Sequence, residues 1–477
     1  MSKSKNKVEL KLVGKSSEDV TGSCLWIKTP DRQILVECGL YQTCGKDSIL
    51  KQYKINSEHF EFNPKHIDYV FVCHTHQDHL GNVPRLYKYG ASCPLIMPEG
   101  SRSIAKILLD DSAKIMASDA RYLSKRFQRD YTPIYEEPDI DATLNALVEY
   151  PIGEFITLDE FVKFRFIPSG HILNSAQLEL HITCGNLVKK ILYTSDLGNI
   201  KVTRRYVNKF EKSGRVNVVV GESTYGKELR ESDDTTREKD LERLRGVVDK
   251  VIETSNGRIL IPVFANSRCQ EILSCLYDLF HDDITFRLPI LVDSPMAINI
   301  CEAYEELLSG EEKEFWDKVR NWRKIIWIRD ADESLSWRKD TRPAIIVCSS
   351  GMITQGRSVL WAQELVPNPN NIIVLCGFSA KGSVGATLKE GKKKSVYISG
   401  KLVRNKCQTV NLTSFTSHMQ RGSLIDYYGD IDCERVILVH GDSESKLSLA
   451  EAVQNRMMEN NKTSRVVISN MGYSIKI

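Results

Sequence analysis

Short runs of alternating apolar and polar positions dominate the first 200 residues. The alternation is clearest in Val8 to Leu12 and in parts of Leu25 to Val36, and it recurs in the ranges 161–168, 177–182 and 191–193. A period of two residues is typical of half-buried β-strands. A stretch at about 101–130 has a helical pattern instead. We therefore expect strands and loops interrupted by one long helix.

The rhythm changes after about residue 216, where a continuous apolar run, Val216 to Val220, predicts a buried strand. An amphipathic segment begins near 235 and stops at Gly257, a typical residue after a helix end. Ser267 and Gln270 have the spacing of a capping box, which predicts the start of the next helix. Further strands are expected at 259–264, 289–293, 344–348 and 372–376.

This alternation of strand and helix predicts a mostly parallel sheet with right-handed crossovers. After about 405 the pattern resembles the first region again, with strands expected at 435–439 and 465–469. The sequence thus predicts a middle region of alternating strands and helices, inserted between two segments dominated by short strands and loops.

Three histidines and an aspartate lie within six residues, in the run His74-Thr75-His76-Gln77-Asp78-His79, directly after an apolar stretch. Imidazole nitrogens and carboxylate oxygens are the ligands that zinc-like ions take. His74 and His76 are two residues apart and point the same way in an extended loop. Asp78 and His79 are adjacent and diverge, which suits a second ion. The competing interpretation, a polar loop with incidental histidines, explains this density poorly.

Four more candidates follow strand-like runs: His171, Asp196, His418 and His440. Strand ends are rigid and their loops accessible, which suits catalytic groups. Taken singly, each is more often a hydrogen-bonded structural residue, but together with the histidine run they complete a two-metal site. We interpret the remaining histidines as structural or surface residues, namely His59, His66, His181 and His281.

Composition narrows the class of protein. The chain has 477 residues, enough for two to four domains, and a net charge of only +3, which weakly favours an anionic partner. Its thirteen cysteines include no Cys-x-x-Cys pair, which favours reduced thiols and a cytoplasmic location. The amino terminus lacks the apolar core of a signal peptide, and no apolar run is long enough to cross a membrane.

Further motifs carry a resemblance to a known family. They are Val20-Thr21-Gly22-Ser23-Cys24, Cys38-Gly39-Leu40-Tyr41-Gln42, Gly170-His171-Ile172-Leu173, Ser195-Asp196-Leu197-Gly198, Glu222-Ser223-Thr224-Tyr225-Gly226, Pro262-Val263-Phe264 with Arg268 and Glu271, Asp293-Ser294-Pro295 and Ser349-Ser350-Gly351-Met352. With the histidine run, they resemble the β-CASP branch of the metallo-β-lactamase superfamily. That branch contains the cleavage and polyadenylation endonuclease, RNase J and compact bacterial RNA-processing nucleases.

The resemblance implies an α/β architecture, an αββα sandwich built from residues 1–215 and 406–477. Residues 216–405 would form an inserted β-CASP cap domain with a mostly parallel sheet. Three positions depart from the family pattern. Glu37 replaces the usual Asp that supports the metal ligands, Asn174 replaces a usual Gly, and Phe378 stands where a Tyr-Gln-Ala-like sequence is common.

The resemblance also implies a ligand set for two Zn²⁺ ions, with Mn²⁺ as the alternative. His74, His76 and His171 would hold one ion, Asp78, His79 and His440 the other, and Asp196 would bridge them. Asp78 and Asp196 therefore count as catalytic. His418 would be the general acid for the leaving oxygen, with its ring held by Glu222. Hydrolysis would give a 5′-phosphate and a 3′-hydroxyl.

Substrate contacts are expected from the cap. The backbone N–H groups of Ser349, Ser350, Gly351 and Met352 could cradle a phosphate. Arg268, Arg357 and Lys381 are candidate phosphate partners, and for each a solvated surface charge is as good an interpretation. The tract Lys392–Lys394 is read first as a solvated loop, with a role in guiding RNA at the rim as the alternative. Tyr225 is left open between a core role and stacking on a base.

The function that follows is a ribonuclease acting on single-stranded RNA, endonucleolytic in RNA processing, with a homodimer left open. The alternatives are a 5′–3′ exoribonuclease of the RNase J type, a DNA nuclease of the same branch and a non-catalytic scaffold. DNA-directed relatives resemble one another in lacking the final histidine, which this chain has as His440. A scaffold that had lost its ligands would not retain all seven positions.

Overall fold

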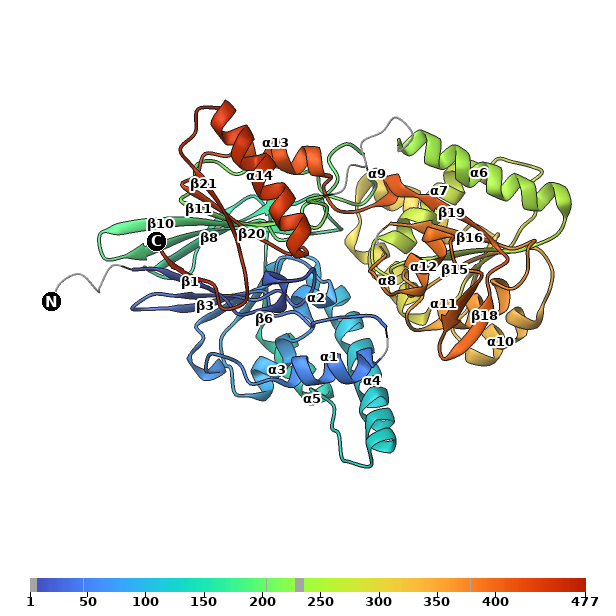
Figure 1. The fold of residues 1–477 in the computed structure, drawn as a ribbon, viewed down its shortest axis with the longest axis horizontal. Helices are drawn as coiled ribbons and strands as arrows, with labels where there is room; N and C mark the ends of the chain where they lie inside the picture. The colour runs from blue at the N-terminus through green and yellow to red at the C-terminus, as the bar shows by residue number, and fades with distance from the viewer. Residues whose placement is uncertain (1–6, 46, 203, 228–235, 378) are drawn as a thin grey trace.

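The computed structural model describes residues 7–45, 47–202, 204–227, 236–377 and 379–477. Phe378, one of the three departures from the family pattern, lies outside them. Two bodies stand side by side (Figure 1): a sandwich formed by both ends of the chain, and a cap formed by its middle. In the described part of the chain, no helix combines the length and apolar character that a membrane crossing requires.

The first sheet of the sandwich contains the early strands and the last one. Its order is β22 (Ser474–Lys476), β1 (Glu9–Leu12), β2 (Leu25–Lys28), β3 (Gln33–Val36), β4 (Tyr69–Phe71), β5 (Leu95–Pro98) and β6 (Leu147–Tyr150). The strands from β22 to β3 pair antiparallel, and those from β3 to β6 pair parallel. The predicted alternation at 8–12 and within 25–36 corresponds to β1, β2 and β3.

The second sheet has the order β21 (Arg465–Ile468), β20 (Arg435–Val439), β11 (Val218–Glu222), β10 (Leu187–Tyr193), β9 (Ala176–Cys184), β8 (Val162–Pro168) and β7 (Phe155–Thr157). Apolar residues from both sheets form one buried cluster, in which Phe71 of the first sheet meets Phe164 of the second edge to face. The sheets are therefore packed face to face.

Helices cover the two outer faces of the sandwich. Those on the first sheet are α3 (Val83–Lys88), α4 (Ser101–Phe127) and α5 (Glu137–Ala146), and those on the second are α13 (Arg421–Asp430) and α14 (Ser443–Glu459). The expected αββα arrangement is confirmed. The helix predicted at about 101–130 is α4.

The cap has a parallel sheet of the order β14 (Ile325–Trp327), β13 (Ile290–Val292), β15 (Ile345–Cys348), β12 (Ile259–Pro262), β16 (Ile372–Cys376) and β19 (Gln408–Leu412). One face packs on α6 (Arg237–Thr254), α7 (Arg268–Phe280), α8 (Pro295–Leu307) and α9 (Gly310–Arg320). The other packs on α10 (Ala331–Lys339), α11 (Arg357–Leu365), α12 (Val384–Glu390) and a hairpin of β17 (Ser395–Ile398) and β18 (Lys401–Arg404).

Strand pairing moves both predicted cap boundaries by one strand. Strand β11, placed in the cap by the boundary at 216, pairs with β10 and β20 of the sandwich. Strand β19, placed in the sandwich by the boundary at 406, pairs with β16 of the cap. The change of sequence rhythm precedes each crossing, because the sequence of a single strand does not show which sheet it joins. The cap thus lies between Glu222 and Leu412.

The helix start predicted at Ser267 is confirmed, although without the capping hydrogen bond, and the helix end predicted at Gly257 was wrong. Ser267 does precede α7, but its hydroxyl makes no cap hydrogen bond, because it accepts one from the Arg204 guanidinium at 2.8 Å instead. Helix α6 ends at Thr254, where Ser255 takes the left-handed conformation two residues before Gly257. At Ser267 a contact between the two bodies outweighs the local capping pattern.

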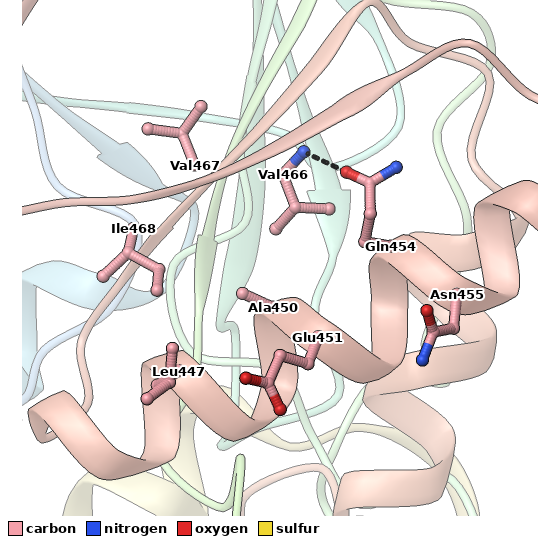
Figure 2. A pocket seen from close by; sticks show the side chains of 8 residues that line it. All are labelled: Leu447, Ala450, Glu451, Gln454, Asn455, Val466, Val467 and Ile468. Atoms are coloured by element: carbon pink, nitrogen blue, oxygen red, sulfur yellow. Dashed lines mark hydrogen bonds between the residues drawn. The ribbon is translucent and has the colours of Figure 1, made fainter.

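Strand β21 is at the edge of the second sheet, and α14 lies along it. Between them is a surface hollow of about 670 Å³ with an apolar lining that includes Leu447, Val467 and Ile468 (Figure 2). Gln454 reaches across from α14, where its Oε1 accepts a hydrogen bond from the Val466 N–H at 3.0 Å. This contact occupies one donor of an edge that could otherwise pair with another chain.

Candidate metal centre

The predicted ligands converge where strands of both sheets end. His74 and His76 follow β4, while Asp78 and His79 lie in the short helix α2 (Gln77–Leu80). The others follow β8, β10 and β20 and are His171, Asp196 and His440 respectively. Strand ends from two packed sheets fix these side chains relative to one another.

Asp196 lies between two groups of histidines. Its Oδ2 is 3.6 Å from His74 Nε2 and 3.4 Å from His171 Nε2. Its Oδ1 is 3.3 Å from His79 Nε2 and 3.5 Å from His440 Nε2. One carboxylate oxygen therefore faces each group, which is the arrangement that a bridging ligand requires.

The ligand atoms form two sets, each within 4.8 Å: His74, His76, His171 and Asp196, and then Asp78, His79 and His440. In the first set, His76 Nδ1 is 3.2 Å from both His74 Nε2 and His171 Nε2. In the second, Asp78 Oδ2 is 3.4 Å from His440 Nε2 and 3.7 Å from His79 Nε2. All seven predicted ligands are thus brought together.

Buried polar atoms in this cluster lack partners. His79 Nε2 and Asp196 Oδ1 are buried and make no hydrogen bond within the described residues. Buried polar groups in folded proteins nearly always have a partner. Metal coordination would satisfy these atoms, and the mixed nitrogen and oxygen donors suit a zinc-like ion. The residues present therefore fit two metal ions.

Burial also sets the protonation of three of the predicted ligands. It lowers the pKa of His74 and His171 well below the ordinary value, and that of His76 to about 4. These imidazoles are neutral at pH 7, as metal ligands must be. Burial would raise the pKa of Asp196, but the neighbouring imidazoles outweigh it and hold the pKa well below the usual range.

Glu37 contacts one predicted ligand, His79, directly and a second, His74, through Ser195. Its Oε1 is 3.4 Å from His79 Nδ1 and accepts a hydrogen bond from the Ser195 hydroxyl at 3.1 Å. Ser195 Oγ is also 3.2 Å from His74 Nδ1. Glu37 is fully buried and has a positive φ of 63°, an unusual backbone conformation for a residue other than glycine. Partners of this kind fix the orientation of metal-binding rings.

Two further supports were not predicted. Thr224 Oγ1 is 3.1 Å from His440 Nδ1, and the Ser417 carbonyl oxygen is 3.2 Å from His171 Nδ1. Both residues are next to candidates named from the sequence. A threonine hydroxyl and a backbone carbonyl have no distinctive pattern in the sequence, so only the structure shows that they contact predicted ligands.

His418 and Glu222 form a pair beside the metal ligands. His418 Nδ1 is 3.4 Å from Glu222 Oε1, and His418 Nε2 is 4.0 Å from Asp196 Oδ2. Glu222 itself accepts hydrogen bonds from the N–H groups of Leu197 at 2.9 Å and Thr224 at 3.1 Å. Burial would lower the pKa of His418, but the carboxylates of Glu222 and Asp196 outweigh it and raise the pKa.

The side chain of His418 is 16% exposed, compared with 2% for that of Asp196. With Asp78, whose side chain is 18% exposed, it is therefore one of the members of the cluster that a substrate can reach from outside. Tyr225 packs edge-on against it, with 6.0 Å between ring centroids, and is completely buried. Tyr225 is thus a core residue, and the open alternative of stacking on a base does not apply.

Two cap arginines expected near the substrate are engaged within the protein. Arg268 is 4% exposed and pairs with Glu271. Arg357 pairs with the buried Asp293 at 2.5 Å and also donates to the Asp330 carbonyl oxygen. The structure does not bring either guanidinium to the metal ligands, and both stabilise the cap.

The remaining candidates lie on the cap surface. Ser349 to Met352 follow β15 and are partly exposed, and the Ser350 hydroxyl accepts hydrogen bonds from the N–H groups of Thr354 and Gln355. Lys381 is exposed. Asn174, the departure from glycine, is part-buried against Gly100, where an added Cβ would be 2.3 Å from its Nδ2. Asn174 therefore fills space beside the start of α4.

The cap touches the loops that carry the predicted metal ligands. Asn266 Nδ2 donates to Thr75 Oγ1 at 3.1 Å. Arg204 donates to the His171 carbonyl oxygen at 2.5 Å and, through its other terminal nitrogen, to Ser267 of the cap. Both contacts place a cap residue against a segment that carries a metal ligand.

Glu271 is the centre of a buried charge network at this junction. Its Oε1 is 2.8 Å from Arg237, and its Oε2 faces Arg268 and, at 3.5 Å, Arg204. The Arg237 guanidinium lies 3.5 Å from the centre of the Phe415 ring, three residues before His418. Burial would raise the pKa of Glu271, but the three guanidinium groups outweigh it and lower the pKa to about 2.

Comparison with known proteins places these features in a family. Residues 269–388 match the Beta-Casp domain, and residues 403–464 match the Zn-dependent metallo-hydrolase RNA specificity domain. The chain is 30% identical over 436 residues to an RNase J-like protein of Methanocaldococcus jannaschii, which covers 90% of this chain and 92% of that protein.

Other relatives match over similar lengths. Ribonuclease TTHA0252 of Thermus thermophilus is 27% identical over 452 residues, covering 93% of this chain and 96% of that protein. Transcription termination factor FttA of M. jannaschii is 28% identical over 452 residues, covering 92% of this chain and 68% of that protein. A solved protein of unknown function from Enterococcus faecalis V583 shares the fold, with a TM-score of 0.53, 13% identity and coverage of 99% of this chain and 100% of that chain.

Proposed function

This chain belongs to the β-CASP family of metal-dependent nucleases, and on that premise we propose that it is a two-metal ribonuclease. The observation that carries the proposal is Asp196, whose two oxygens face two separate histidine groups. His74, His76 and His171 would hold one ion, and Asp78, His79 and His440 the other. The substrate is single-stranded RNA, in keeping with relatives named as ribonucleases.

Zn²⁺ is the proposed metal, with Mn²⁺ as the alternative, since both accept nitrogen and oxygen ligands. Two bound divalent ions neutralise the charge of a phosphodiester and lower the pKa of an attacking water. The chain's own residues supply the rest. Asp78 and Asp196 would supply carboxylate ligands, and Glu37 orients His79 and, through Ser195, His74.

His418 is the proposed general acid. Its Nδ1 faces Glu222, so the exchangeable proton for the leaving oxygen is held at Nε2. Glu222 stabilises the charged ring, and two backbone N–H groups fix Glu222 in turn. His418 Nε2 donates this proton to the leaving 3′ oxygen. One product then has a 3′-hydroxyl and the other a 5′-phosphate.

We propose endonucleolytic cleavage in RNA processing as the principal mode. A 5′–3′ exonuclease of the RNase J type is the second candidate, favoured by the similarity to the RNase J-like protein. Circular RNA has no terminus, so its digestion distinguishes the two modes. We expect circular RNA to be cut. Intact circular RNA, with linear 5′-monophosphate RNA degraded to mononucleotides, would establish the exonuclease instead.

A further inference from the structure

The cap carries a concentrated positive surface that the metal centre does not use. Residues 389–406 contain seven basic residues and one acidic residue, a net charge of +6. Because the whole chain carries only +3, the remaining residues sum to −3. The near-neutral total therefore conceals one strongly basic segment. It comprises the end of α12, the loop that follows and the hairpin of β17 and β18.

The basic side chains of this segment are available to a partner. Lys392, Lys393 and Lys394 are exposed, as are Lys401, Arg404 and Lys406. Within the part of the chain that the structure describes, none of these six is paired with a carboxylate, although ion pairs are frequent elsewhere on the surface. The loop is held by Asn405, whose N–H and side-chain amide donate to the carbonyl oxygens of Lys394 and Lys393.

An aromatic side chain lies beside these charges. Tyr397 is 70% exposed and is paired across the hairpin with Leu402, which is 62% exposed. Opposite residues of an antiparallel pair share one face, and Ser395 and Arg404 are the next pair on that face. Val396, Ile398 and Val403 are buried on the other face, so the hairpin is anchored to the cap core.

Helix α12 connects the segment to the loop that follows β15, where Ser349 to Met352 are the expected phosphate contacts. The Gly385 N–H near the start of α12 donates to the Met352 carbonyl oxygen at 3.0 Å. Helix α12 has seven residues, which span about 10 Å, and the lysine tract follows its end. Lys392 to Lys394 line a surface hollow of about 320 Å³ together with Asn405, Cys407 and Thr409. Figure 1 places β18 on the side of the cap away from the sandwich.

We propose that the lysine tract and the exposed face of the β17–β18 hairpin form a second RNA-binding surface, which holds substrate nucleotides remote from the cleaved bond. Lys392 to Lys394 contact phosphates, and Tyr397 stacks on a base. Charged side chains beside an exposed aromatic ring suit a single strand, whose bases are free to stack. This inference rests on the proposed function. It assigns to this surface the binding of those substrate nucleotides that are far from the cleaved bond.

The test compares a long and a short RNA. A variant with Lys392, Lys393 and Lys394 each changed to Ser removes three charges, and Lys114, Lys125 and Lys318 changed to Ser form the matched control. These control lysines are exposed on α4 and α9, away from the hairpin. We expect the first variant to cleave an RNA of about six nucleotides at the wild-type rate but to lose kcat/KM on one of about thirty. The control should match wild type on both.

Binding separates this inference from the proposed function, because it does not require cleavage. In the plot of log affinity against log salt for the long RNA, each lost phosphate contact lowers the slope by about 0.7, so we expect a decrease of up to about 2 for the triple variant. Tyr397→Ala should weaken binding of the long RNA about tenfold or more, and Tyr397→Phe should retain it.

An unchanged slope and affinity in the lysine variant would overturn the inference, as would an equal loss in the control. Anionic vesicles that bind the same surface and displace RNA would also overturn it, by assigning the lysines to membranes. If wild-type protein binds long RNA through these lysines but cleaves neither RNA, the proposed function fails and the binding surface stands.

Discussion

The Glu271 network provides a prediction whose size follows from the structure. Glu271→Gln removes the negative charge that compensates Arg204, Arg237 and Arg268 at a position only 6% exposed. The pKa of Glu271 is lowered from 4.5 to about 2, and one unit corresponds to about 1.4 kcal/mol. The ionised carboxylate therefore contributes about 3 kcal/mol, in the range expected for breaking a buried ion pair. We expect the substitution to destabilise the cap by that amount at pH 7.

Urea unfolding followed by tryptophan fluorescence measures this effect. Five of the six tryptophans, all except Trp26, lie in the cap, so the signal reports mainly on that body. Glu312→Gln, at an exposed site in α9, is the matched control and should unfold at the wild-type midpoint. Because the protein has two bodies, the cap transition is fitted separately from any transition of the sandwich.

The dependence on pH has a definite sign. Glu271 has a lowered pKa in the folded protein, so its contribution is complete above the unfolded value of about 4.5 and is lost as the pH falls towards about 2. The difference in the free energy of unfolding of the cap between wild type and Glu271→Gln should therefore become smaller as the pH falls through that range. Equal midpoints of the two proteins at pH 7 would refute the reasoning, as would a difference that is unchanged at the lowest pH.

Three further results are expected. His418→Ala should retain its metal ions and lose about 10²–10⁴-fold in cleavage rate, since general acid–base catalysis is worth that much, and loss of both ions in this variant would show that His418 is a ligand instead. Glu37→Ala should weaken metal binding by about 10–100-fold in a competition titration, while Glu154→Ala at an exposed site should not; equal affinities would mean that Glu37 does not orient His79. Single-stranded RNA should be cut in preference to duplex RNA or DNA, and a gel assay that shows equal cleavage of all three would contradict the proposed substrate.

Much of the metal centre could be predicted because its signals are local. His74 to His79 occupy one run after a strand, and residue type and spacing alone indicate metal ligands. The family resemblance then indicated which distant residues complete the set, and the structure brings all seven together. Ser195, Thr224 and the Ser417 carbonyl could not be found in this way, because ordinary polar groups acquire their role only from the ring that they face.

The interpretations that changed depended on long-range contacts. Arg268 was a plausible phosphate partner until the fold buried it against Glu271. Ser267 has a capping pattern, yet its hydroxyl accepts a hydrogen bond from Arg204 of the other body. Strands β11 and β19 carry no local signal that assigns them to either sheet, and only their pairing with β20 and β16 assigns them. In each case a partner far away in the sequence decides the outcome.

Metal content is the most direct test of the two-metal centre. Elemental analysis of gently purified protein should find about two zinc-like ions per chain, because two ligand sets share one carboxylate. Removal of the ions with a chelator should abolish RNA cleavage, and their return should restore it. Protein that carries no transition metal, and that no added Zn²⁺ or Mn²⁺ activates, would contradict the account.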